Sequence, residues 1–137
     1  MIMQTINKKA LTLVEIVIVT IVVGILAVVG LLKYNDVTSK ARQRDASANL
    51  TLISYAQRMY HAAMNNYYPS SGTASIASIN SNLKLNITSS DAEYTCSLGS
   101  VDYYSCVACF PSCAASTWTY TMTADMVIPS CVGAECL

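Results

Sequence analysis

The sequence predicts an α+β protein, in which a long N-terminal helix packs on a small antiparallel β-sheet. Two features predict the helix: an apolar run over residues 11–32, and a helical pattern over residues 33–64 that contains neither Pro nor Gly. One feature predicts the sheet, because beyond residue 93 short runs rich in Tyr, Thr and Val alternate with Gly, Pro and Asp. The length of 137 residues suits one small head domain and one long helix.

The apolar run has the length of a membrane-spanning helix. It reads LTLVEIVIVTIVVGILAVVGLL and holds a single charge, Glu15, in 22 residues. At 1.5 Å per residue this run forms a helix of about 33 Å, which is enough to cross a bilayer core. Lys8 and Lys9 precede the run, and basic residues tend to stay on the cytoplasmic side. We therefore expect a single membrane span whose N-terminus faces the cytoplasm.

Three interpretations of residues 1–32 compete. A cleaved secretory signal is disfavoured because its apolar stretch spans about 7–15 residues and ends at a small-residue cleavage site, whereas LLKYND follows this run. A plain membrane anchor does not explain why Glu15 is present, since a central charge costs about 3 kcal/mol to insert. Cleavage between Ala10 and Leu11 would explain it. The new amine of Leu11 would pair with Glu15 of a neighbouring copy, and this pair would set the register of identical helices.

The segment KKALTLVEIVIVTIVVGILAVVG resembles the N-terminus of type IV pilins and of the related secretion pseudopilins. In that family a basic leader ends in a small residue, and the mature chain begins with an apolar residue and carries Glu at its fifth position. The resemblance implies a leader over residues 1–10, cleavage by a prepilin peptidase after Ala10, and methylation of the Leu11 amine. It also implies that Thr12 and Glu15 serve assembly. Ala10 stands where Gly is usual, and Leu11 where Phe is usual.

Residues 33–64 predict an amphipathic helix that continues from the membrane segment into the head. Apolar side chains recur at spacings of three and four, which places them on one face that we expect to lie on the sheet. We expect Leu52, Tyr55 and Met59 to widen this face. Charged and amide side chains, including Gln57, are expected to lie largely off it. The stripe consists of Ala46, Leu50, Ile53, Ala56, Tyr60 and Ala63.

Residues 65–93 are predicted to form the loop between the helix and the sheet. Asn65, Asn66 and Pro69 end the helix. The stretch NNYYPSSG resembles the loop that follows the long helix in pilins and pseudopilins. The remainder is rich in Ser, Asn and Thr, which predicts a surface-exposed connection with one short helix near residues 75–83.

Residues 94–137 are predicted to form the antiparallel sheet with a disulfide-rich C-terminal region. A Pro within the last strand-like run, Pro129, predicts an edge strand or a bulge. The predicted strands cover residues 94–98, 102–108, 117–123 and 126–132.

All cysteines of the chain fall in this last region, and an even number in a short, exported segment predicts disulfides. Six cysteines admit 15 pairings, among which spacing does not choose. The resemblance to pilins implies one pair, Cys131–Cys136, because pilins commonly close a C-terminal loop in this way. A zinc or redox site is disfavoured, since zinc needs about four ligands and the only histidine, His61, lies far upstream. The candidates are Cys96, Cys106, Cys109, Cys113, Cys131 and Cys136.

The composition offers little for catalysis or for nucleic acid. With one histidine and no Gly-rich phosphate loop, we predict that the chain is not an enzyme, and that it has no catalytic residue, cofactor or metal site. Beyond residue 60 a single base, Lys84, stands against five acids, a formal charge of −4, which disfavours direct nucleic-acid binding.

The resemblance implies a structural pilin of a type IV pilus. Its expected partners are copies of itself in a filament, other minor pilins, the prepilin peptidase, an inner-membrane assembly platform, and membrane lipid before assembly. One alternative is a pseudopilin of a type II secretion system, which would form a short periplasmic filament. Another is a membrane-anchored extracytoplasmic binding or redox domain, which would not need Glu15.

Overall fold

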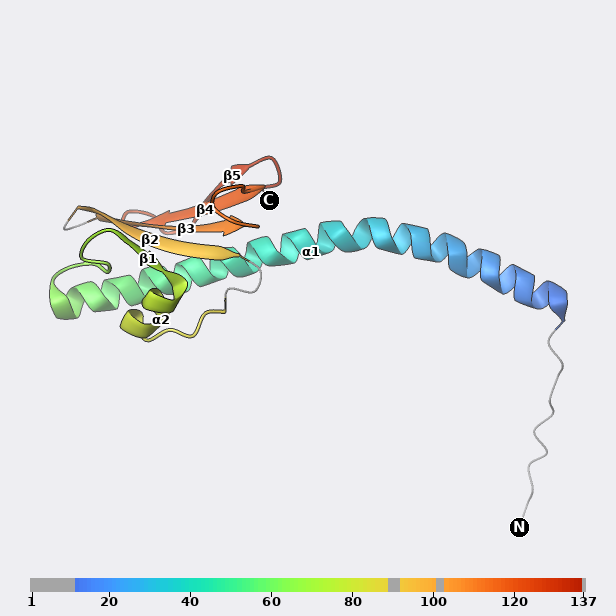
Figure 1. The fold of residues 1–137 in the computed structure, drawn as a ribbon, viewed down its shortest axis with the longest axis horizontal. Helices are drawn as coiled ribbons and strands as arrows, with labels where there is room; N and C mark the ends of the chain where they lie inside the picture. The colour runs from blue at the N-terminus through green and yellow to red at the C-terminus, as the bar shows by residue number, and fades with distance from the viewer. Residues whose placement is uncertain (1–11, 89–91, 101–102, 137) are drawn as a thin grey trace, which may run out of the picture. The chain divides into compact units, whose positions relative to one another are not determined.

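The computed structural model describes residues 12–88, 92–100 and 103–136 of the chain. It confirms the predicted α+β class, a long helix with a small antiparallel sheet (Figure 1). Contacts divide the chain into two compact units, Met1–Thr38 and Ser39–Leu137, and we describe each by itself. The elements are α1 (Leu13–Met64), β1 (Thr73–Ser75), α2 (Ile76–Leu83), β2 (Glu93–Ser100), β3 (Tyr103–Phe110), β4 (Trp118–Thr123) and β5 (Ser130–Gly133).

Helix α1 ends where the sequence predicts, at Met64. Asn65 follows with a positive φ of 54° and donates its backbone N–H to the His61 carbonyl at 2.8 Å. Asn tolerates this left-handed conformation because its short polar side chain can bond locally. The chain therefore leaves the helix at Asn65.

The sheet has five strands in the order β1-β2-β3-β4-β5, and every neighbouring pair is antiparallel. Strands β2, β3 and β4 match three predicted strands to within two residues at each described end. The predicted fourth strand over residues 126–132 is wrong in its first half, because β5 begins only at Ser130. Pro129 immediately precedes β5, and proline has no N–H to donate to a ladder with β4. Strand β1 was not predicted; its three residues are too short to carry a strand pattern.

The hydrophobic core of the second unit lies between α1 residues 39–64 and one face of the sheet. Leu50 and Ile53 on α1 are fully buried, as are Tyr104 and Cys106 on β3. This confirms that Leu50 and Ile53 of the predicted stripe face the core. The predicted widening is wrong, because Leu52, Tyr55 and Met59 are exposed, as is Ala63 at its end. One sheet covers only one side of a helix, and these residues lie outside that side.

Residues 65–93 are more buried than the sequence predicts. Apolar residues of this segment enter the core, so it is a structural part of the head, not a surface connection. They are Ala74, Ile79, Leu83, Ile87 and Ala92. The predicted short helix is present as α2.

Amide side chains hold this segment in place. Gln57 accepts the backbone N–H of Tyr68 at 2.9 Å and donates its Nε2 to the Tyr68 carbonyl. Asn80 makes the same two bonds to Ile87. It accepts the backbone N–H at 3.0 Å and donates its Nδ2 to the carbonyl at 2.8 Å. Each amide thus satisfies both backbone groups of a loop residue, as a neighbouring strand would. The prediction that Gln57 lies off the packed face is wrong, since it is fully buried.

Candidate functional site

The described part of the first unit is an apolar helical surface with no cover within the described chain. The large apolar side chains of residues 13–28 are between 45% and 79% exposed. Among the described residues, α1 is the one helix whose length and composition would allow it to cross a membrane. A contiguous apolar surface of this extent marks contact with lipid or with other protein.

Two threonine hydroxyls of this unit donate to carbonyls of their own helix. Thr20 Oγ1 donates to the Val17 carbonyl at 2.9 Å, and Thr38 Oγ1 donates to the Tyr34 carbonyl at 2.8 Å. Such bonds satisfy a hydroxyl without water. The threonines therefore do not oppose burial of the helix in an apolar surrounding.

Thr12 and Glu15 form the start of α1. Thr12 Oγ1 accepts the backbone N–H of Glu15 at 3.3 Å, and its carbonyl accepts the N–H groups of Glu15 and Ile16. This is an N-cap, and the spacing Thr-x-x-Glu is that of a capping box. Glu15 also lies in the first turn, where the helix dipole favours a negative charge. The segment TLVE carries the sequence signal of this cap, which the prediction of an assembly role for Thr12 and Glu15 did not include.

The cleavage position lies outside the described residues. Residues 1–10, Ala10 and Leu11 all precede the first described residue, Thr12. Cleavage after Ala10, methylation of Leu11 and pairing of its amine with Glu15 stay predictions.

All six cysteines form disulfides, as predicted. Cys96–Cys106 joins residues directly opposite each other on β2 and β3, and both are buried in the core. Cys131–Cys136 is the pair implied by the resemblance. The remaining pair, Cys109–Cys113, closes a short loop after β3. No cysteine of the chain is free in the structure.

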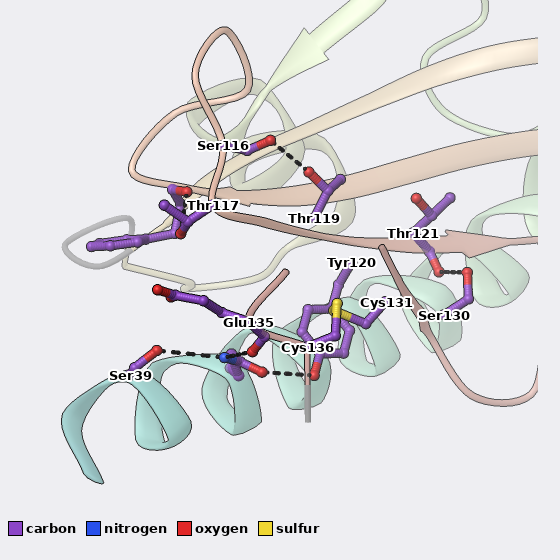
Figure 2. Close-up of a disulfide and its surroundings, with 12 residues drawn as sticks. Ser39, Ser116, Thr117, Thr119, Tyr120, Thr121, Ser130, Cys131, Glu135 and Cys136 are labelled. Carbon is purple, nitrogen blue, oxygen red and sulfur yellow. Dashed lines mark hydrogen bonds between the residues drawn. A yellow bond between two sulfur atoms is a disulfide. The ribbon is translucent and has the colours of Figure 1, made fainter. Parts of the chain in front are cut away.

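The C-terminal disulfide loop, with Cys131, Glu135 and Cys136, lies beside α1 (Figure 2). A hydrogen bond from Gln43 of α1 ties the loop to the helix. Gln43 Nε2 donates to the Glu135 carbonyl at 2.6 Å, and its Oε1 accepts the Tyr120 hydroxyl at 3.4 Å. Sequence reasoning missed this contact. A signal existed, because positions 43, 46, 50, 53 and 57 follow helical spacing, so both buried glutamines share the phase of the core stripe.

Histidine and carboxylate groups do not gather into a cluster in the described ranges. His61 stacks on Tyr67 with ring centroids 4.4 Å apart. Within residues 12–88, 92–100 and 103–136 there is no group of three His, Cys, Asp or Glu placed to hold a metal ion.

Comparison of the chain with models of known protein families, with curated proteins and with solved structures finds no match. The resemblance to type IV pilins therefore depends on the N-terminal motif and on the loop and disulfide features noted above.

Proposed function

We propose that this chain is a structural subunit of an extracellular filament of the type IV pilin class. The observation that carries the proposal is an exposed apolar helical surface with one carboxylate, Glu15, in its first turn. A plain anchor needs the apolar surface, and in it the carboxylate would serve only the helix start at Thr12. A subunit that moves from lipid into a bundle of identical helices uses both.

In the proposed mechanism, a prepilin peptidase cuts between Ala10 and Leu11 at the cytoplasmic side of the inner membrane. The helix then holds the subunit in lipid until the assembly platform lifts it into the filament. There the Glu15 carboxylate of one subunit meets the Leu11 amine of another. In a water-free bundle each charge offsets the desolvation cost of the other, whereas either alone would be costly.

The second unit supports an extracytoplasmic place for the head. Three disulfides within residues 96–136 form and persist in an oxidising compartment. The same unit carries its own core, so it can stay folded both beside the membrane and on a filament. The role is structural, and it requires no catalytic site, cofactor or metal.

The first test is intact-mass analysis of the chain purified from cells, together with electron microscopy of sheared surface material. We expect an N-terminus at Leu11, one added methyl group, six oxidised cysteines, and the chain within thin fibres. An N-terminus at Met1 would contradict the processing step. Short filaments confined to the periplasm would instead indicate a secretion pseudopilin.

The second test replaces the carboxylate. Glu15→Gln removes one charge of a buried pair, and we expect fibre yield to fall at least about a hundredfold while the precursor is still cut. Glu135→Gln is the matched control, since Glu135 is exposed in the C-terminal loop, and it should leave fibre yield unchanged. Normal fibre yield from Glu15→Gln would refute the pairing.

A further inference from the structure

A shallow apolar groove lies along α1 on the side of α2. It has a volume of about 430 Å³ and is lined by Leu52, Tyr55 and Met59 of α1 and by Leu83 and Leu85 at the end of α2. The α1 side chains are well exposed, Met59 at 75%. Exposed apolar side chains that gather in a groove mark a site of protein contact.

Lys84 stands at the rim of this groove in a fixed conformation. It caps α2 with a left-handed backbone, and its N–H donates to the Asn80 carbonyl. Leu85 donates to the same carbonyl at 3.0 Å. These bonds fix the backbone from which the Lys84 and Leu85 side chains extend.

The loop between β4 and β5 carries an apolar projection, Val127 and Ile128, which are 80% and 75% exposed. Its base is held in place, because Arg58 Nη2 donates to the Met126 carbonyl at 3.5 Å and Pro129 is buried. Asp125, exposed, precedes the projection by two residues. The loop thus presents two branched side chains beside a negative charge.

The groove and the projection lie toward opposite edges of the same sheet. Helix α2 contacts β1 and β2 at one edge, and the projection precedes β5, the other edge strand (Figure 1). A patch and a complementary pocket at different places on one molecule make a head-to-tail contact, which repeats without closing on itself. Lys84 and Asp125 carry opposite charges, so a second copy that places Val127 and Ile128 in the groove can bring its Asp125 to Lys84.

We infer that the groove receives Val127 and Ile128 of a neighbouring copy of this chain, with Lys84 beside Asp125 of that copy. The inference rests on the proposed function and adds a contact between heads to the packing of the apolar helices. The projection buries its two side chains between Leu52, Met59 and Leu85. Lys84 and Asp125 set which copies meet and in which orientation.

Photocrosslinking in fibres made by the full-length chain tests the contact. A benzophenone amino acid replaces Val127, and the crosslinked peptides are identified by mass spectrometry. We expect subunit dimers whose crosslinks reach Leu52, Met59 or residues 82–85, since Tyr55 and Arg58 already lie beside Val127 in the same chain. The matched control places the same group at Ala114, an exposed position in the loop after β3, and should give no crosslink to the groove. Crosslinks from Val127 to other segments, or none between subunits, would overturn the inference.

Charge reversal gives an independent readout. Lys84→Glu and Asp125→Lys each place like charges together, so each should lower fibre yield on the order of tenfold, and the double variant should restore it. Failure of the double variant to recover, or normal yield from both single variants, would overturn the contact while leaving the proposed function in place. Absence of fibres from the unaltered chain would overturn the proposed function, and this contact with it. Intact mass with all six cysteines oxidised verifies that each variant folds.

Discussion

The two units of this chain differ in how their apolar side chains are covered. The second unit buries Leu50, Ile53 and Tyr104 in one core and links two of its strands by the disulfide Cys96–Cys106. Residues 12–38 are described as one stretch of helix whose apolar side chains have no cover within the described chain. The second unit supplies its own apolar surrounding, whereas the apolar side chains of the first are exposed within the described chain.

This difference separates stability from assembly. A change to a buried side chain of the second unit should alter the free energy of unfolding of the head, while the same change in the first unit should alter insertion or fibre formation. Trp118, the single tryptophan, is almost fully buried in β4 and reports on the second unit alone. Its fluorescence during denaturation of the full chain in detergent therefore measures the free energy of unfolding of the second unit.

The largest difference is expected between two leucines of the same helix. Leu50→Ala removes a fully buried side chain and should lower the free energy of unfolding by about 2–5 kcal/mol. Leu26→Ala makes the same chemical change where the side chain is 65% exposed and should cost less than about 0.5 kcal/mol in the same assay. Equal losses at the two positions would break the distinction between the units.

Loss of a disulfide should have the next largest effect on the free energy of unfolding. Replacing both Cys96 and Cys106 by Ala should lower the free energy of unfolding by about 2–4 kcal/mol, because the crosslink limits the unfolded chain. Replacing both Cys131 and Cys136 should cost about 0.5 kcal/mol less, since the closed loop is shorter, a separation of 5 residues against 10. A larger loss from the C-terminal pair would mean that its contact with Gln43 matters more than the crosslink.

The amide contact of Gln57 should have a comparable or smaller effect. Gln57→Leu keeps the size but leaves the N–H and carbonyl of Tyr68 without their partners, at a cost of about 1–3 kcal/mol. Asn35→Ala removes an exposed amide from the first unit and should change the free energy of unfolding by less than about 0.5 kcal/mol. Denaturation midpoints that coincide for Gln57→Leu and the unaltered chain would refute the structural role of the contact.

The smallest expected effect is a pH dependence of the free energy of unfolding of the second unit. Burial raises the pKa of the Tyr104 phenol, although its hydrogen bond with Ser54 and the nearby Arg58 charge oppose the shift. The unfolded chain then loses this proton first, near pH 10, so it binds fewer protons than the folded chain above that pH. The free energy of unfolding should therefore fall as pH rises above about 10. Tyr104→Phe should flatten this fall, although it also loses the 2.8 Å hydrogen bond to Ser54. An unchanged slope would exclude Tyr104 as its source.

Several elements were predictable because their signals are local. The end of α1 follows from Asn65, Asn66 and Pro69, and α2 was placed within one residue. Strand β5 and strand β1 were misplaced or missed, because an edge strand is defined by its partner and both are short. The segment TLVE has the pattern of an N-cap at Thr12, although the sequence prediction for Thr12 and Glu15 concerned assembly only.

By itself the sequence determined the periodic and compositional features: the apolar helix with its single carboxylate, the core stripe through Leu50, and a C-terminal region in which cysteines pair. These follow from spacing and composition, which act over a few residues. Only the tertiary structure decided that Gln43 and Gln57 are buried, that Tyr55 and Met59 are exposed, and that Cys96 faces Cys106. The physical reason is that helical spacing orders side chains around an axis, but the sheet decides which side of that axis is covered.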